Sequence, residues 1–157
     1  MVALFLILLF QHQQTDLRVM LDKAYKSESV ANEMRDYLKS ISSPTALEMA
    51  YLGTAEMLMA EHSSFPWTKL KHFHVGSDLL DQASESAPKN LEVRYLRFAC
   101  QTHTPAFLGY TDHLETDKKT LIDGLNKLED LDLKKRIKTL LLDSKHVSND
   151  EKDQLKK

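Results

Sequence analysis

The sequence predicts an all-α protein, and three observations support this. Only four Gly and four Pro occur among the 157 residues, and the helix-favouring residues Leu, Lys, Glu, Ala and Met dominate. From Thr15 onward apolar residues recur at intervals of three and four, the period of a helix with one buried face. Six residues also recur 44 positions apart: Pro44, Leu47, Glu48, Tyr51, Leu52 and Ala55 reappear as Pro88, Leu91, Glu92, Tyr95, Leu96 and Ala99. We therefore expect stacked antiparallel helical hairpins, in about three units with about seven helices.

We expect residues 1–14 to form an apolar leader. Residues 2–10 are continuously apolar, which is shorter than the ~20 residues of a membrane-spanning helix but suits the hydrophobic region of a secretory signal peptide. No Lys or Arg precedes this run and no A-x-A pattern follows it. Export to the periplasm or the cell exterior after cleavage is the expectation. The alternatives are a helix packed on the domain, a residual anchor, or a cytoplasmic protein.

Residues 15–147 are expected to form one helical-repeat domain. Its first two helices form a hairpin, and Ser29 caps the second of them. Ser43 and Pro44 supply a cap and a first-turn proline for a third helix that ends near Glu61. Pro66 opens a fourth helix after the sequence HSSFP, with Trp67 at its entrance. The apolar seam of this helix is Leu70, Phe73, Gly76, Leu80, Ala83 and Ala87.

The second half of the chain continues the pattern. A fifth helix is expected over residues 90–101, followed by a loop that contains Pro105 and Gly109. Asp112 and Glu115 have the spacing of a capping box for a sixth helix. A seventh helix covers residues 133–142, and residues 148–157 form a short capped helix or a frayed tail that starts at Ser148.

The spacing of Gly76, Leu80, Ala83 and Pro88 resembles the second helix of a tetratricopeptide repeat, and PKNLEVRYL resembles the junction into the next repeat. This resemblance covers roughly residues 44–101 and implies a helical-hairpin array that binds proteins. The chain departs from the family at Arg94, Arg97 and Phe98, and its period of 44 exceeds the usual ~34 residues. The whole chain also resembles small uncharacterised exported bacterial proteins, a likeness that implies no known chemistry.

Composition argues against several classes of function. The net charge of -2 comes from 21 basic and 23 acidic residues spread along the chain, so we expect no nucleic-acid partner. His72 and His74 point about 200° apart on a helix and cannot share one ion. Glu61 and His62 form only half of a zinc motif, and no Gly-rich phosphate loop is present. We expect no metal and no cofactor.

Arg94, Arg97 and Gln101 are the candidate partner-binding residues, together with Tyr110. The first three form one polar stripe on the fifth helix. Either the arginines pair internally with Glu115 or Asp117 and pin the loop PAFLGY, or the stripe binds a partner's carboxylate or phosphate.

The expected function is that of a non-catalytic scaffold that binds a protein or peptide. One alternative is a small exported enzyme with a site near Arg94, Arg97, Cys100 and the 102–113 loop. The single Cys100 is expected to be a buried apolar residue, since it cannot form an intramolecular disulfide. A purely structural envelope protein is a further alternative.

Overall fold

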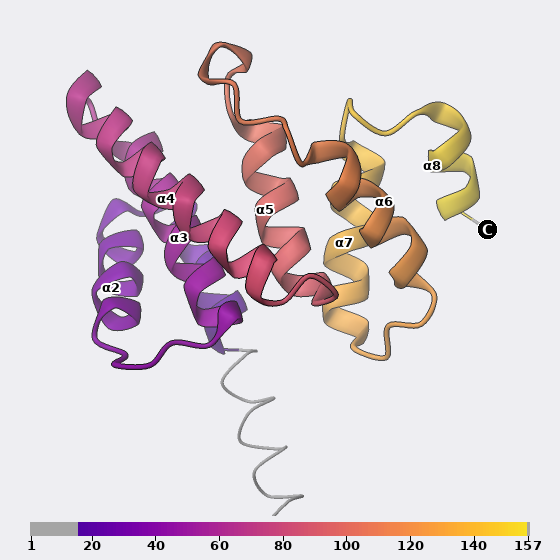
Figure 1. Ribbon diagram of the computed structural model, residues 1–157, viewed down its shortest axis with the longest axis horizontal. Helices are drawn as coiled ribbons and strands as arrows, with labels where there is room; N and C mark the ends of the chain where they lie inside the picture. The colour runs from indigo at the N-terminus through magenta and orange to yellow at the C-terminus, as the bar shows by residue number, and fades with distance from the viewer. Residues whose placement is uncertain (1–15, 157) are drawn as a thin grey trace, which may run out of the picture. The chain divides into compact units, whose positions relative to one another are not determined.

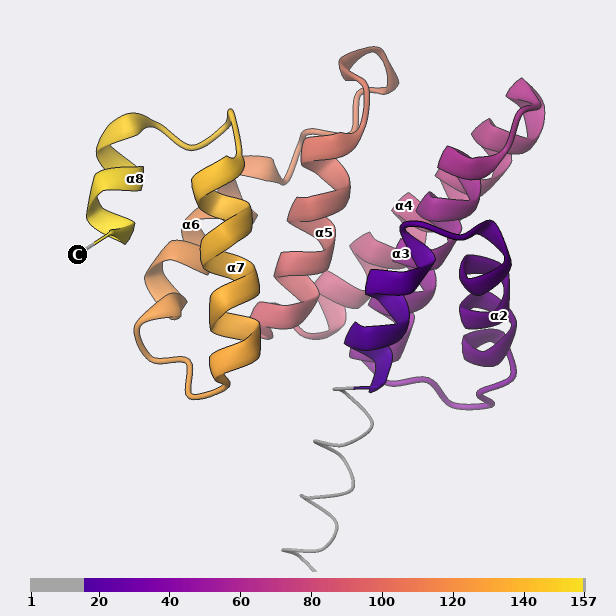
Figure 2. The same ribbon diagram turned by 180° about the vertical axis from the view of Figure 1, so that it is seen from behind.

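The computed structural model describes residues 16–156, which contain helices and turns and no strand (Figures 1 and 2). The predicted all-α class is confirmed. No helix within residues 16–156 is long and apolar enough to cross a membrane. The predicted leader over residues 1–14 lies outside the described residues. The chain divides between Leu79 and Leu80 into two compact units, called unit 1 and unit 2 here.

Unit 1 contains a helix over residues 16–24, α2 (Glu28–Lys39), α3 (Ala46–His62) and α4 (Pro66–Ser86) as far as Leu79. The start of α4 at Pro66 is as predicted. The predicted caps of α2 and α3 are wrong. Ser27, not Ser29, caps α2 by accepting a hydrogen bond from the amide of Val30. Thr45 caps α3 and forms a capping box with Glu48.

The core of unit 1 is built around α3, which buries residues on most of its circumference. Its α2 neighbour contributes Ala31, Met34 and Leu38 to this core. Helix α4 approaches α3 closely where two glycines meet, because a Cβ atom on Gly76 would lie 2.8 Å from the carbonyl oxygen of Gly53. The predicted seam of α4 therefore contains a glycine at position 76 because a larger side chain would clash with the backbone of α3.

Unit 2 contains the end of α4 from Leu80, then α5 (Leu91–His103), the 3-10 turn η1 (Ala106–Leu108), α6 (Leu114–Leu125), α7 (Leu131–Asp143) and α8 (Asn149–Leu155). The predicted capping box of the sixth helix is wrong. His113 is the N-cap residue of α6 and makes no side-chain cap, and the Glu115 carboxylate instead pairs with Lys118 Nζ at 2.8 Å. The predicted cap at Ser148 is confirmed, since Ser148 and Glu151 form a capping box for α8.

Helices α5, α6 and α7 each contact the other two, and α8 contacts α7. Their shared core consists of Phe98, Leu114, Leu121, Leu125, Leu133, Ile137, Leu141, Val147 and Leu155. The face of α5 that turns toward α6 also carries the polar residues predicted as a candidate site. Unit 2 therefore buries a charged cluster beside an apolar core.

Candidate functional site

Asp117 on α6 is the centre of a buried charged cluster in unit 2. It is completely buried and accepts hydrogen bonds from three side chains of α5. Arg94 Nη1 and Arg97 Nη2 donate to Oδ1 at 2.7 and 2.8 Å. Arg97 Nε and Gln101 Nε2 donate to Oδ2 at 2.7 and 2.9 Å. The spacing of three and four residues along α5 places these donors on one face, so that they converge on a single carboxylate.

Asp81 and Tyr110 form the outer edge of this cluster. Arg97 Nη1 donates to Asp81 Oδ1 at 3.0 Å, and the Tyr110 hydroxyl donates to the same oxygen at 3.2 Å. The Asp81 side chain is 34% exposed, whereas that of Arg97 is 3% exposed. Burial and the nearby Asp81 carboxylate raise the pKa of Tyr110, so its hydroxyl stays protonated and acts as a donor at neutral pH. The loop that precedes Tyr110 is thereby tied to α4 and α5.

The charges within the cluster balance. Two guanidinium groups, of Arg94 and Arg97, face the carboxylates of Asp117 and Asp81. The pKa of Arg97 is raised above its ordinary value. Burial by itself would lower this pKa, but the hydrogen bonds and negative charge of Asp117 and Asp81 outweigh that effect. Arg94 Nε also donates to the carbonyl oxygen of Pro88 at 2.9 Å. These donors are therefore directed into the protein.

The structure brings together all four predicted site residues, Arg94, Arg97, Gln101 and Tyr110. Of the two acidic partners expected for an internal clamp, it selects Asp117, because the Glu115 side chain is 75% exposed and faces Lys118. Sequence reasoning missed Asp81. This residue lies beside Leu80 on the apolar seam of α4, and its distance from Arg97 depends on the turn between α4 and α5, which the sequence does not fix.

The region of the alternative enzymatic site holds a thiol, a hydroxyl and an imidazole near the end of α5. Cys100 is half-buried. The Thr102 hydroxyl and His103 Nδ1 both bond the carbonyl oxygen of Ala99, at 2.9 and 2.8 Å. His103 Nδ1 therefore carries a proton and donates it to the backbone. This arrangement does not place a free ring nitrogen as a base against the Thr102 hydroxyl.

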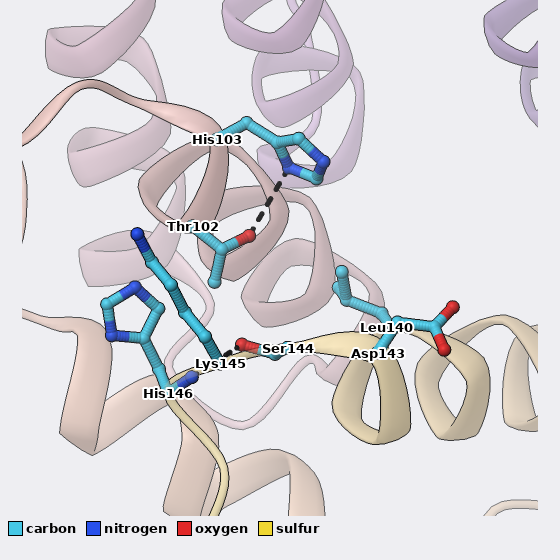
Figure 3. Close-up of a pocket in the computed structure, with 7 residues that line it drawn as sticks. All are labelled: Thr102, His103, Leu140, Asp143, Ser144, Lys145 and His146. Carbon is cyan, nitrogen blue, oxygen red and sulfur yellow. Dashed lines mark hydrogen bonds between the residues drawn. The ribbon is translucent and has the colours of Figure 1, made fainter.

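An open cleft of about 330 Å³ lies between the C-terminal ends of α5 and α7. It is lined by Thr102, His103, Leu140, Asp143, Ser144, Lys145 and His146 (Figure 3). Figure 3 shows the His103 ring on the opposite side of Thr102 from the His146 ring, so the two imidazoles do not converge. The negative ends of two helix dipoles meet here, which disfavours an anionic ligand despite Lys145.

Unit 1 contains a buried carboxylate of its own, Glu56 on α3. It pairs with Lys39 Nζ of α2 at 2.6 Å and with the His72 ring of α4, so one side chain connects three helices. Burial acts to raise the pKa of Glu56, but the hydrogen bonds from Lys39 and His72 outweigh it and lower the pKa below its ordinary value. His72 therefore faces Glu56, while His74 is exposed on another side of α4. Within residues 16–156, no group of three or more His, Cys, Asp or Glu side chains could hold a metal ion.

Three aromatic side chains are largely exposed. Phe107 is 85% exposed on η1 in unit 2, and Phe65 and Trp67 are 73% and 83% exposed at the start of α4 in unit 1. Exposed aromatic rings that stand on ordered turns are typical of contact sites, because covering them removes a large apolar area from water. The sequence placed Trp67 at the entrance of α4 but gave no indication that it is exposed.

Comparisons of the chain with protein-family models, with curated proteins and with solved structures found no match.

Proposed function

We propose that this protein is a non-catalytic helical scaffold that binds a protein or peptide partner through the loop over residues 104–110, with Phe107 as the anchor. The observation that carries the proposal is the combination of a highly exposed phenylalanine with a loop that is tied down on both sides of it. Figure 1 shows this loop projecting beyond the C-terminal end of α5.

The backbone around Phe107 is ordered by short-range hydrogen bonds. Thr104 Oγ1 donates to the Cys100 carbonyl at 2.8 Å, and the amides of Leu108 and Gly109 donate to Pro105 and Ala106 at 3.0 and 3.1 Å. Gly109 adopts a φ of 69°, a conformation that favours glycine. The turn therefore holds Phe107 in place before a partner arrives, which lowers the entropic cost of binding.

The buried cluster fixes the far end of the loop. Tyr110 bonds Asp81, which bonds Arg97, which bonds Asp117. The partner contacts Phe107, and the loop is held for it by Arg94, Arg97, Gln101 and Tyr110. Burying one exposed phenylalanine contributes about 2–3 kcal/mol, which is typical of an anchor residue at a protein interface.

We also propose that the protein acts outside the cytoplasm. The support is the continuous apolar run over residues 2–10, which has the length of a signal-peptide core. The intact mass of the protein isolated from its native cell tests this: we expect the loss of about 10–14 residues from the amino terminus. An unprocessed cytoplasmic species as the main product would contradict export.

Photo-crosslinking tests the binding proposal. A photoreactive phenylalanine analogue is placed at position 107, or at Leu131 as the matched control, because Leu131 is 78% exposed at the start of α7 in the same unit. Ultraviolet irradiation of cells that make the protein should give a discrete protein adduct from position 107 and none from position 131. Identical adduct patterns from both positions, or no adduct from position 107, would refute the proposal.

A further inference from the structure

The turn between α3 and α4 carries two of the most exposed aromatic side chains of residues 16–156, Phe65 and Trp67. They flank Pro66, which begins α4. In Figures 1 and 2 this turn projects beyond the ends of α2 and of the helix over residues 16–24, so other parts of unit 1 do not cover it. The two rings therefore form the tip of a projecting helical hairpin.

The tip is ordered. The Phe65 amide donates to Ser63 Oγ at 3.3 Å, and the Phe65 carbonyl accepts from the Lys69 amide at 2.9 Å. At the base of the turn, the His62 ring bonds the Ala24 carbonyl oxygen at 3.0 Å and ties the end of α3 to the first helix. Phe65 and Trp67 are thus presented by a fixed backbone.

The charge around the tip is positive, although the whole chain carries -2. Residues 61–71 contain Lys69 and Lys71 against the single carboxylate of Glu61, a net charge of +1 with histidine neutral. Both lysines are exposed on the first turns of α4, on different sides of the helix, and Lys69 Nζ reaches back toward the turn to the Glu61 carbonyl oxygen at 3.5 Å. Aromatic rings at a tip with lysines behind them match a membrane interface, where Trp and Phe enter the headgroup region and Lys meets anionic lipids.

We propose that the α3–α4 turn docks unit 1 onto an anionic membrane surface by inserting Phe65 and Trp67 among the lipid headgroups. Lys69 and Lys71 then face the anionic headgroups from the protein side. The contact is peripheral, and it is independent of the partner proposed for Phe107.

Trp67 is the only tryptophan of the chain, so its fluorescence reports on this turn alone. This matters because the apolar run over residues 2–10 can itself attach the full chain to lipid, and sedimentation with vesicles would not tell the two contacts apart. With phosphatidylcholine vesicles that contain phosphatidylglycerol, we expect Trp67 emission to shift to shorter wavelength. Lipids brominated in their acyl chains should quench it.

Variants identify the groups involved. Phe65→Ser should lower the vesicle partition coefficient measured by Trp67 fluorescence at least about tenfold. Phe107→Ser, at an even more exposed aromatic position in unit 2, should leave that coefficient unchanged. Lys69→Gln with Lys71→Gln should weaken it by about fivefold per lysine, and the charge-matched pair Lys127→Gln with Lys135→Gln should not. If vesicles neither shift nor quench the emission of Trp67, even when the chain sediments with them, the proposal is overturned. An equal loss in Phe107→Ser would overturn it too.

Discussion

Replacing Arg97 with Met tests whether the buried cluster of unit 2 is a structural clamp. The substitution keeps most of the apolar stem but removes the guanidinium, which donates to Asp117 through Nε and Nη2 and to Asp81 through Nη1. Asp117 is completely buried, so water cannot replace the lost donors. It retains only Arg94 and Gln101.

The expected cost is large. Removing one partner of a buried ion pair typically costs about 3–5 kcal/mol, because an uncompensated charge is left behind. Since Arg94 still neutralises Asp117, we expect a loss in the free energy of unfolding at the lower end of this range, about 3 kcal/mol. With a urea m value of about 2 kcal/mol/M, the midpoint of unfolding falls by about 1.5 M. The unfolding midpoint of Arg97→Lys should lie between those of the wild type and Arg97→Met, because lysine keeps the charge but cannot form the forked contact.

Urea unfolding followed by far-ultraviolet circular dichroism measures this effect in both units, whereas the fluorescence of Trp67 reports only on unit 1. Arg136→Met is the matched control. Arg136 pairs with Asp132 at 2.9 Å on the surface of α7, and such exposed pairs contribute at most about 1 kcal/mol. If Arg97→Met costs no more than Arg136→Met, the clamp is refuted. Unchanged stability with loss of the adduct at position 107 would instead make Arg97 a partner contact.

Three further predictions concern unit 1 and the helix contacts. Glu56→Gln should destabilise the protein by about 2–3 kcal/mol at neutral pH in thermal or urea unfolding, because Lys39 and His72 lose their buried carboxylate. The pKa of folded Glu56 is below its ordinary value of 4.5, so its contribution is present above that value and is lost as the pH falls through the folded pKa. The wild type should therefore lose stability on acidification more steeply than Glu56→Gln, and parallel curves would contradict this. Gly76→Ala should cost about 1–3 kcal/mol, because the new Cβ meets backbone atoms of α3. Gly124→Ala should cost less, since the three atoms nearest to its new Cβ all belong to the movable Leu91 side chain and alanine favours the helix by about 1 kcal/mol; equal costs would refute this packing argument.

The helices were predictable from the sequence because apolar periodicity and proline positions mark them clearly, as at Pro66. The caps were less predictable. Two polar residues that can cap a helix lie within two positions of each other at Ser27 and Ser29, and at Ser43 and Thr45, and the local sequence does not decide between them. The stacking of repeated hairpins and the equivalence of Tyr51 and Tyr95 stay predictions, because they concern the placement of one unit relative to the other.

The candidate site was predictable where it depends on one helix. The stripe of Arg94, Arg97 and Gln101 follows from helical spacing alone, and burying two guanidinium groups requires acidic partners. The choice of Asp117 over Glu115 depends on the rotation of α6, and the role of Asp81 depends on the turn after α4. Glu56 was missed because it lies among the apolar residues of α3, where its partners come from two other helices.

The most direct test of the account is the yield of the adduct at position 107 when Tyr110 is replaced by Phe. This change removes only the hydroxyl that bonds Asp81 and leaves the exposed Phe107 position intact. We predict an unchanged helical circular dichroism spectrum, faster amide hydrogen exchange over residues 104–110, and a clearly lower yield of the same adduct. Faster exchange with an undiminished adduct would contradict the claim that the buried cluster holds this loop in the form that the partner binds.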